Sequence, residues 1–222
     1  MPDLDDSPIR DESNDDTPIV AILDYISAQS NELAEAISAT GADVYVTSNW
    51  AMCISADGLI VPNHDSVFDV ARELNLVRGA ELIDARLIAN KSVLALGNAF
   101  NLLFELEDKA QVNNEKFQQW PGVSKARVDQ ATVGWQQVKA AENSKLFANI
   151  HDQEFFFDNE LSVSQWVLDA QGPLTAPKVS WVKQGEGYVA AVENGPLIAA
   201  QFLPEKSRSA GHRLLTNWVK SL

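Results

Sequence analysis

The stretch that most constrains the fold covers residues 92–105, where a short apolar run changes into a helix-like apolar cluster. Gly97 and Asn98 stand at the change, which is the pattern of a strand, a sharp turn and a helix that packs back on the strand. In enzymes that use this turn, its tip presents a nucleophile, and backbone N–H groups at the start of the helix stabilise a developing oxyanion. The tip here is Gly97, which has no side chain, so the sequence predicts the turn without the nucleophile.

Length, charge and cysteine content narrow the class of protein. The chain has 222 residues, which fits one large α/β domain or two small ones, and 45% of them are hydrophobic, enough to bury a sizeable core. No apolar run approaches the length of a membrane-spanning helix, and the sequence does not start like a secretory signal. The net charge of −14 argues against nucleic acid or an anionic membrane as a partner, because phosphate binding needs clustered Lys and Arg. The single cysteine, Cys53, excludes an internal disulfide framework and fits the reducing cytoplasm.

The first half of the chain has the pattern of a parallel α/β sheet. Residues 1–17 are acidic, with almost nothing to bury, and we predict a disordered tail before a single domain over residues 18–222. Apolar runs predict strands over residues 19–23, 43–47, 58–62 and 92–96. Helical spacing predicts helices over about 30–40, 66–75 and 79–89, and one from Asn98, with Cys53 in a short connecting segment. This order predicts a parallel sheet with helices on both faces.

The second half changes to short strands. We expect them over residues 155–157, 163–167, 179–182, 188–192 and 197–202, followed by a helix over about 209–219. Asn194–Gly195, between the last two strands, is typical of a hairpin turn. The second half therefore adds an antiparallel β region to the parallel sheet.

Several segments together resemble a known family. Residues 189–193, 201–207 and 213–218 resemble the C-terminal part of class I glutamine amidotransferases. Residues 21–25, 56–62, 102–105, 133–138 and 145–147 look like the glutaminase subunit of imidazole glycerol phosphate synthase, so the resemblance covers residues 18–222. It implies the flavodoxin-like three-layer α/β fold of this family, with a central mostly parallel sheet. It also implies a place in histidine biosynthesis, where the subunit hydrolyses glutamine and supplies ammonia to a (β/α)₈-barrel cyclase partner.

The catalytic residues of that family are only partly present. A cysteine at the turn attacks the glutamine amide, a histidine acts as its base and a glutamate orients the histidine. The family's Gly-x-Cys-x-Gly matches residues 95–99 here, which puts Gly97 at the cysteine position. Its Phe-His-Pro-Glu matches residues 202–205, which puts Leu203 at the histidine position and retains Glu205. The resemblance therefore implies a degenerate member that has lost glutaminase activity.

The oxyanion loop differs as well. The family's Pro-Gly-x-Gly is here Pro62 followed by Asn63, His64 and Asp65. Glycines there let a backbone N–H turn toward the substrate oxygen, and the charge of Asp65 would oppose an oxyanion. The family's His-Ser-Tyr segment is replaced near residues 159–161. The glutamine site is therefore altered in several independent places.

No other residue clearly restores the chemistry. Cys53, the only thiol, is expected to be a buried structural cysteine. His64 beside Asp65 is the best remaining acid/base pair, although adjacent residues do not by themselves make a catalytic pair and a polar loop is the favoured explanation. His151 and His212 are scattered, so the sequence predicts no metal site, and it contains no cofactor-binding motif.

Partner binding is a property that such a chain can retain. Trp135, Gln136 and Gln137 match a family segment near the cyclase interface, and Trp135 is either an interface anchor or a core residue. Three functions remain open: a catalytically inactive subunit that still binds the synthase, an independent small-molecule-binding or regulatory module, and a hydrolase that uses His64, Asp65 or Glu205.

Overall fold

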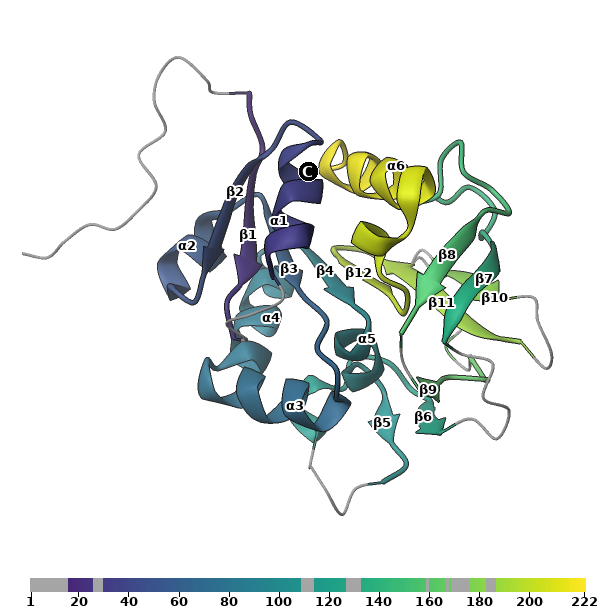
Figure 1. Cartoon of the computed structure of the whole chain (residues 1–222). Helices are drawn as coiled ribbons and strands as arrows, with labels where there is room; N and C mark the ends of the chain where they lie inside the picture. Colours follow the sequence, from purple (N-terminus) through teal and green to yellow (C-terminus); the bar gives the residue numbers. More distant parts are fainter. Residues whose placement is uncertain are drawn as a thin grey trace, which may run out of the picture.

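The computed structural model describes residues 16–25, 30–108, 114–126, 133–158, 160–166, 168, 176–182 and 187–222 (Figure 1). The first half alternates strands and helices: β1 Ile19–Leu23, α1 Ser30–Ser38, β2 Asp43–Thr47, α2 Trp50–Ser55, β3 Gly58–Val61, α3 Val67–Leu76, α4 Gly79–Ile88, β4 Ser92–Leu96 and α5 Asn98–Leu102. The second half has mostly strands: β5 Glu105–Leu106, η1 Glu115–Phe117, β6 Val123–Ala126, β7 Gly134–Lys139, β8 Glu154–Phe157, β9 Leu161–Ser162, β10 Lys178–Val182, β11 Tyr188–Asn194, β12 Leu197–Ala200, η2 Pro204–Lys206 and α6 Arg208–Val219.

One nine-stranded sheet joins the two halves of the chain, in the order β2-β1-β3-β4-β12-β11-β10-β7-β8. The strands from β2 to β12 are parallel neighbours, and the strands from β12 to β8 are antiparallel neighbours. The predicted hairpin at Asn194–Gly195 joins β11 to β12. The expected fold, a parallel sheet extended by an antiparallel region, is therefore confirmed.

Helices cover both faces of the parallel part of the sheet. Side chains of α2, α3, α4 and α5 belong to one buried apolar cluster, together with one set of alternate strand residues. Side chains of α1 and α6 belong to a second cluster, with the other set. All five residues of β1 are buried because the strand lies between the two layers, which explains its continuous apolar run. The helix, sheet and helix layers are visible in Figure 1.

Two segments differ in detail from the sequence expectations. Cys53 lies in the expected short connecting segment, which forms the helix α2, where the Asn49 side chain accepts the N–H of Met52 at 3.0 Å. Residues 163–166 form no strand, because their apolar side chains pack instead against an aromatic cluster. The ring centroid of Trp166 lies 5.9 Å from that of Trp120 and 6.2 Å from that of Phe104. Burial of a loop therefore produced a strand-like pattern.

Two expectations about the ends of the domain stay predictions. Residues 1–15 of the predicted acidic tail lie outside the described residues, and the single domain over 18–222 is supported by the sheet that its two halves share. Within the described ranges, none of the helices has the length and apolar character needed to cross a membrane.

Candidate functional site

The sharp turn predicted at Gly97 is present between β4 and α5. Gly97 has a φ of 58° and a ψ of −122°, a combination that side-chain-bearing residues adopt only under strain. Its N–H donates to the carbonyl of Ala200 at 2.9 Å, which ties the tip of the turn to the end of β12. The scaffold that would hold a nucleophile is therefore retained, with a residue that adopts this conformation freely.

The Asn63 side chain occupies the space directly beside the tip. A Cβ atom built on Gly97 would lie 2.1 Å from Oδ1 of Asn63 and 2.4 Å from its Cγ, far inside van der Waals contact. The same Oδ1 accepts the backbone N–H of Asn98 at 2.7 Å. An N–H directly after the tip is the kind of donor that stabilises an oxyanion in enzymes with this turn. Asn63 therefore fills the position of a side chain on residue 97 and also occupies that donor.

A chain of buried polar side chains continues below the turn. Asn98 donates through Nδ2 to the carbonyl of His64 at 2.7 Å and accepts from Asn101 at 3.4 Å. Asn101 in turn accepts from the Ser124 hydroxyl at 2.8 Å and from the Gln201 amide at 3.4 Å. These contacts fix the loop at residues 63–65 to α5, because each buried polar group that lost its partner would cost free energy.

Leu203 and Glu205 lie beside the turn on the segment that follows β12. Leu203 is buried, and its N–H donates to the carbonyl of Phe156 at 2.9 Å. The Glu205 Oε2 atom is buried without a hydrogen-bond partner among the described residues. Burial raises the pKa of the Glu205 carboxyl to about 7, while its own backbone N–H and Lys206 oppose the rise and Glu32 adds to it. The retained glutamate therefore has no base to orient and carries a carboxyl that is costly to ionise.

Two cavities flank the turn, and Gly97 lines neither. One of about 380 Å³ is bounded by α1, the end of β3 and the segment after β12, with Asn63, Leu203 and Glu205 in its wall. Another of about 270 Å³ includes Asn98 and Asp65. Asn63 fills the space directly beside the tip of the turn, and Gly97 is not among the residues that line these two cavities.

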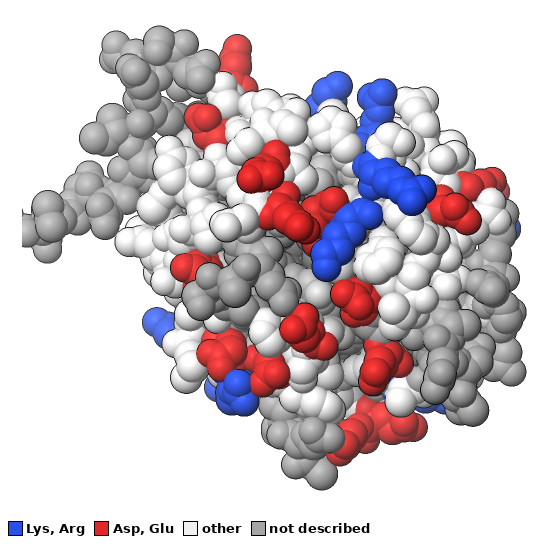
Figure 2. Space-filling view, in the orientation of Figure 1, with Lys and Arg blue, Asp and Glu red and all other residues white. Residues whose placement is uncertain are grey.

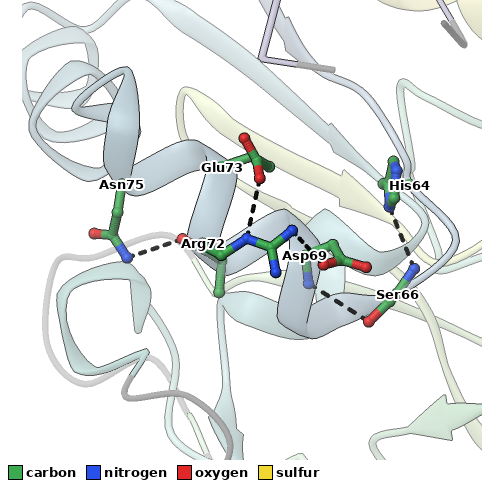
Figure 3. A network of polar contacts seen from close by, with 7 residues as sticks. His64, Ser66, Asp69, Arg72, Glu73 and Asn75 are labelled. Atoms are coloured by element: carbon green, nitrogen blue, oxygen red, sulfur yellow. Dashed lines mark hydrogen bonds and ion pairs between the residues drawn. The ribbon is translucent and has the colours of Figure 1, made fainter. Parts of the chain in front are cut away.

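His64 and Asp65 lie on the loop before α3. Figure 3 shows the His64 ring turned toward Ser66, whose N–H donates to Nδ1 at 3.5 Å. Ser66 also caps α3 by accepting the Asp69 N–H at 3.5 Å, and Asp69 pairs with Arg72 at 2.7 Å. The described contacts of the His64 ring therefore stabilise the loop and the start of α3.

The remaining candidates from the sequence lie apart from the turn. Cys53 is fully buried, and burial raises the pKa of its thiol to about 11, an effect that the Arg86 charge opposes. A thiol of that pKa is a poor nucleophile at neutral pH. His151 and His212 are exposed. Within the described ranges, no group of three or more His, Cys, Asp and Glu side chains could hold a metal ion.

The three interface candidates lie on β7 in different environments. Trp135 is half-buried, packs edge-on against Phe156 at 5.8 Å and carries the Arg208 guanidinium over its ring at 4.2 Å. Gln136 is buried, whereas the exposed Gln137 donates to the carbonyl of Asp152 at 3.1 Å. Of these, Trp135 and Gln137 have solvent-accessible side-chain surface.

Sequence reasoning missed the role of Asn98 and Asn101. The signal available was two asparagines three residues apart on an otherwise apolar helix, a spacing that places both on one face. Polar side chains that are buried on an apolar helix need hydrogen-bond partners. Here the loop at residues 63–65 and Ser124 supply them.

Comparison with known proteins gives relatives over nearly the whole chain. No protein-family model matches it. The imidazole glycerol phosphate synthase subunit HisH of Leifsonia xyli subsp. xyli is 38% identical over 205 residues, which cover 91% of this chain and 98% of that protein. The protein of the same name from Nocardia farcinica is 39% identical over 207 residues, with 91% and 98% covered.

Solved structures agree on the fold. A crystal structure of a glutamine amidotransferase superposes with a TM-score of 0.69 at 11% identity, covering 91% of this chain and 99% of that one. The structure of PurLQS from Thermotoga maritima gives a TM-score of 0.62 at 14% identity, covering 92% and 99%. These matches show the class I glutamine amidotransferase fold, and the identity to the curated relatives shows that the chain belongs to the HisH family of imidazole glycerol phosphate synthase subunits.

Proposed function

We propose that this chain is a non-catalytic HisH-type subunit, which binds a (β/α)₈-barrel cyclase without hydrolysing glutamine. In such a complex the cyclase would use ammonia from solution, and the subunit would stabilise or gate the barrel. The HisH relatives support the partner, because they are named as subunits of the synthase. The altered turn supports the loss of hydrolysis.

The observation that carries the proposal is the contact between Asn63 and the turn at residues 97–98. Oδ1 of Asn63 accepts a hydrogen bond from the N–H of Asn98 and lies 2.1 Å from the position of a Cβ on residue 97. A nucleophile and an oxyanion would both have to displace this amide. In hydrolases, loss of a covalent nucleophile or its base alone lowers turnover by roughly 10⁶. Gly97, Leu203 and Asn63 together therefore support the proposal that the chain forms no acyl-enzyme.

The direct test is to purify the chain with the cyclase barrel from the same source, with and without the cyclase's nucleotide substrate. We expect the two proteins to co-elute, and we expect cyclase turnover with ammonium salts but not with glutamine. Glutamine-dependent turnover would refute the non-catalytic assignment. Failure to co-elute at micromolar concentrations would refute the subunit assignment.

A restoration series tests the inactivation separately. The double variant Gly97→Cys, Leu203→His returns the family's two missing side chains but keeps Asn63. We expect it to show no glutaminase activity, and its new thiol to react slowly with iodoacetamide. Adding Asn63→Gly frees the space and the Asn98 N–H, so the thiol should then react faster. Equal reactivity in both variants would show that Asn63 does not block the turn.

The second candidate is an independent small-molecule-binding or regulatory module on the same fold. The cavity of about 380 Å³ favours it, because its volume lies within the range of ligand sites in proteins. This reading predicts a folded, ligand-responsive chain that forms no complex with the cyclase. The co-elution experiment separates the two candidates.

A further inference from the structure

The cavity beside η2 has a polar wall with an acidic side. It is bounded by Asn31 and Glu32 at the start of α1, by Pro62 and Asn63 after β3, and by Leu203, Glu205 and Lys206 after β12. Leu33 completes the lining. Three separate segments of the chain therefore place two carboxyl groups and a small apolar surface around one space.

Glu205 is the unusual member of this wall. It lines the cavity, and its Oε2 atom is buried with no partner among the described residues. A buried oxygen of this kind costs free energy unless a donor reaches it. The terminal torsion of a glutamate is broad, so a rotation about it would turn this carboxyl toward the cavity. A hydrogen-bond donor inside the cavity would then satisfy it.

The charges around the cavity favour a cation as that donor. Glu32 lies close enough to Glu205 to oppose its ionisation, so both carboxylates act on the same space. Lys206 is the basic residue in the wall and acts on Glu205 more strongly than Glu32 does, and its Nζ also lies 3.9 Å from the carboxylate of Asp158. A cation with several N–H donors would satisfy Glu205 and reduce the repulsion between the two glutamates.

We propose that this cavity binds a small primary amine in its ammonium form, with the ammonium group at Glu205 and Glu32. The short carbon chain of the amine lies against Leu33, Pro62 and Leu203, which supply the apolar part of the wall. The cavity of about 380 Å³ is at the lower end of the range for ligand sites, so it suits a molecule of a few heavy atoms. Such a small ligand binds with a Kd on the order of 1 mM.

The experiment uses the full chain without any partner and n-butylammonium chloride as the probe. ¹H–¹⁵N chemical shifts and the melting temperature are followed against matched sodium chloride and n-butanol. Butanol has the same shape without the charge, and sodium chloride controls for ionic strength. We expect butylammonium alone to raise the melting temperature and to shift the amide signals of residues in the cavity wall.

Glu205→Gln keeps the shape of the side chain and removes its charge, so we expect it to weaken butylammonium binding at least about tenfold. Glu35→Gln, on the exposed side of α1 outside the cavity wall, is the matched control and should bind like the parent chain. The proposal is overturned if butanol acts like butylammonium, or if Glu205→Gln binds unchanged. Because no cyclase is present, this outcome is independent of whether the chain forms the synthase complex.

Discussion

At the residue scale, the Asn63 side chain occupies the space that a side chain on residue 97 would need. The effect of a substitution at either residue should therefore depend on which residue stands at the other position. Gly97→Ala would put a Cβ 2.1 Å from Oδ1 of Asn63 and force alanine into the φ of 58°. Backbone strain and overpacking each cost about 1–3 kcal/mol. We expect Gly97→Ala to lower the free energy of unfolding by about 2–4 kcal/mol, measured by urea denaturation.

The double variant provides the control for that prediction. Asn63→Ala alone removes the acceptor of the Asn98 N–H and should cost about 1–3 kcal/mol. In Asn63→Ala, Gly97→Ala the overlaps with Oδ1 and Cγ are gone and only the overlap with the Cβ of residue 63, at 2.7 Å, remains, so the two losses should sum to more than the measured total. Strict additivity would mean that the two side chains do not compete for the same space.

Glu205 gives the stability of the chain a pH dependence. Its carboxyl pKa rises from an ordinary 4.5 to about 7 on folding because of burial, with Glu32 adding and its own backbone N–H and Lys206 opposing. Below pH 4.5 the carboxyl is protonated in both the folded and the unfolded states, so it makes no difference to stability. Between pH 4.5 and 7 only the unfolded state loses the proton, so the folded state becomes relatively less stable, by up to about 3 kcal/mol.

Glu205→Gln isolates this contribution. The variant cannot ionise, so we expect it to unfold at higher urea concentration than the parent chain at pH 8 and at nearly the same concentration at pH 4.5. The control Glu35→Gln removes an exposed carboxylate from α1 and should leave the pH profile unchanged. A constant difference between Glu205→Gln and the parent across this pH range would contradict the raised pKa.

The site was only half predictable from these residues. The turn at Gly97 followed from a local pattern, a strand and a helix separated by one glycine, and local patterns are what a sequence displays. The occupation of the turn by Asn63 joins residues 34 positions apart. It depends on the rotamer of one side chain within a folded loop, for which periodicity carries no signal. Asn63 was identified only as an altered loop residue.

At the scale of elements, the effect of a substitution at Gly211 depends on the contact between α6 and η2. It lies inside α6, where glycine costs about 1 kcal/mol relative to alanine in an exposed helix. A Cβ on Gly211 would lie 1.9 Å from the carbonyl oxygen of Pro204 in η2. We therefore expect Gly211→Ala to destabilise the chain by about 1–3 kcal/mol despite its better helix propensity.

The matched control lies one residue further along the same helix. His212→Ala changes an exposed side chain and should alter the free energy of unfolding by no more than about 0.5 kcal/mol. Because η2 carries Glu205, the separation of η2 from α6 in Gly211→Ala should also shift the amide signals of that segment. If Gly211→Ala were more stable than the parent chain, η2 would be able to move away from α6 at little cost in free energy.

Helices and strands were predictable where the segment was long enough to show a pattern and the pattern matched its burial. The strands β1, β3 and β4 are continuous apolar runs because both faces are covered, and the sequence displays this directly. Helix α2 was missed because six residues are too few for a helical period to emerge. The expectation of a strand was wrong for residues 163–166, because apolar side chains in a buried loop produce the same local composition as a strand.

At the scale of the whole molecule, the basic side chains are unevenly distributed. The chain has a net charge of −14, yet residues 204–222 carry four basic side chains against the single acidic Glu205. Figure 2 shows Lys and Arg gathered over the region of η2 and α6, with Asp and Glu over much of the remaining face. Arg208, from this basic segment, lies over the Trp135 ring. The basic region and the interface candidate on β7 therefore form one surface.

This surface is where we expect the cyclase to bind, and Trp135 is its most suitable anchor. A half-buried tryptophan stacked with an arginine combines a large apolar area with charge, the composition that dominates binding energy at interfaces. We expect Trp135→Ala to weaken the complex by about 2 kcal/mol, a rise in Kd of roughly thirtyfold, measured by titration calorimetry.

The chain offers a matched control for Trp135→Ala in a second tryptophan–arginine pair. Arg78 lies 4.8 Å from the ring of Trp50, which is 38% exposed on α2, a helix on the other face of the sheet from α6. Trp50→Ala removes an equivalent pair and should leave the Kd for the cyclase unchanged. Equal losses from the two variants would indicate general destabilisation, and an unchanged Kd for Trp135→Ala would move the interface away from the basic region.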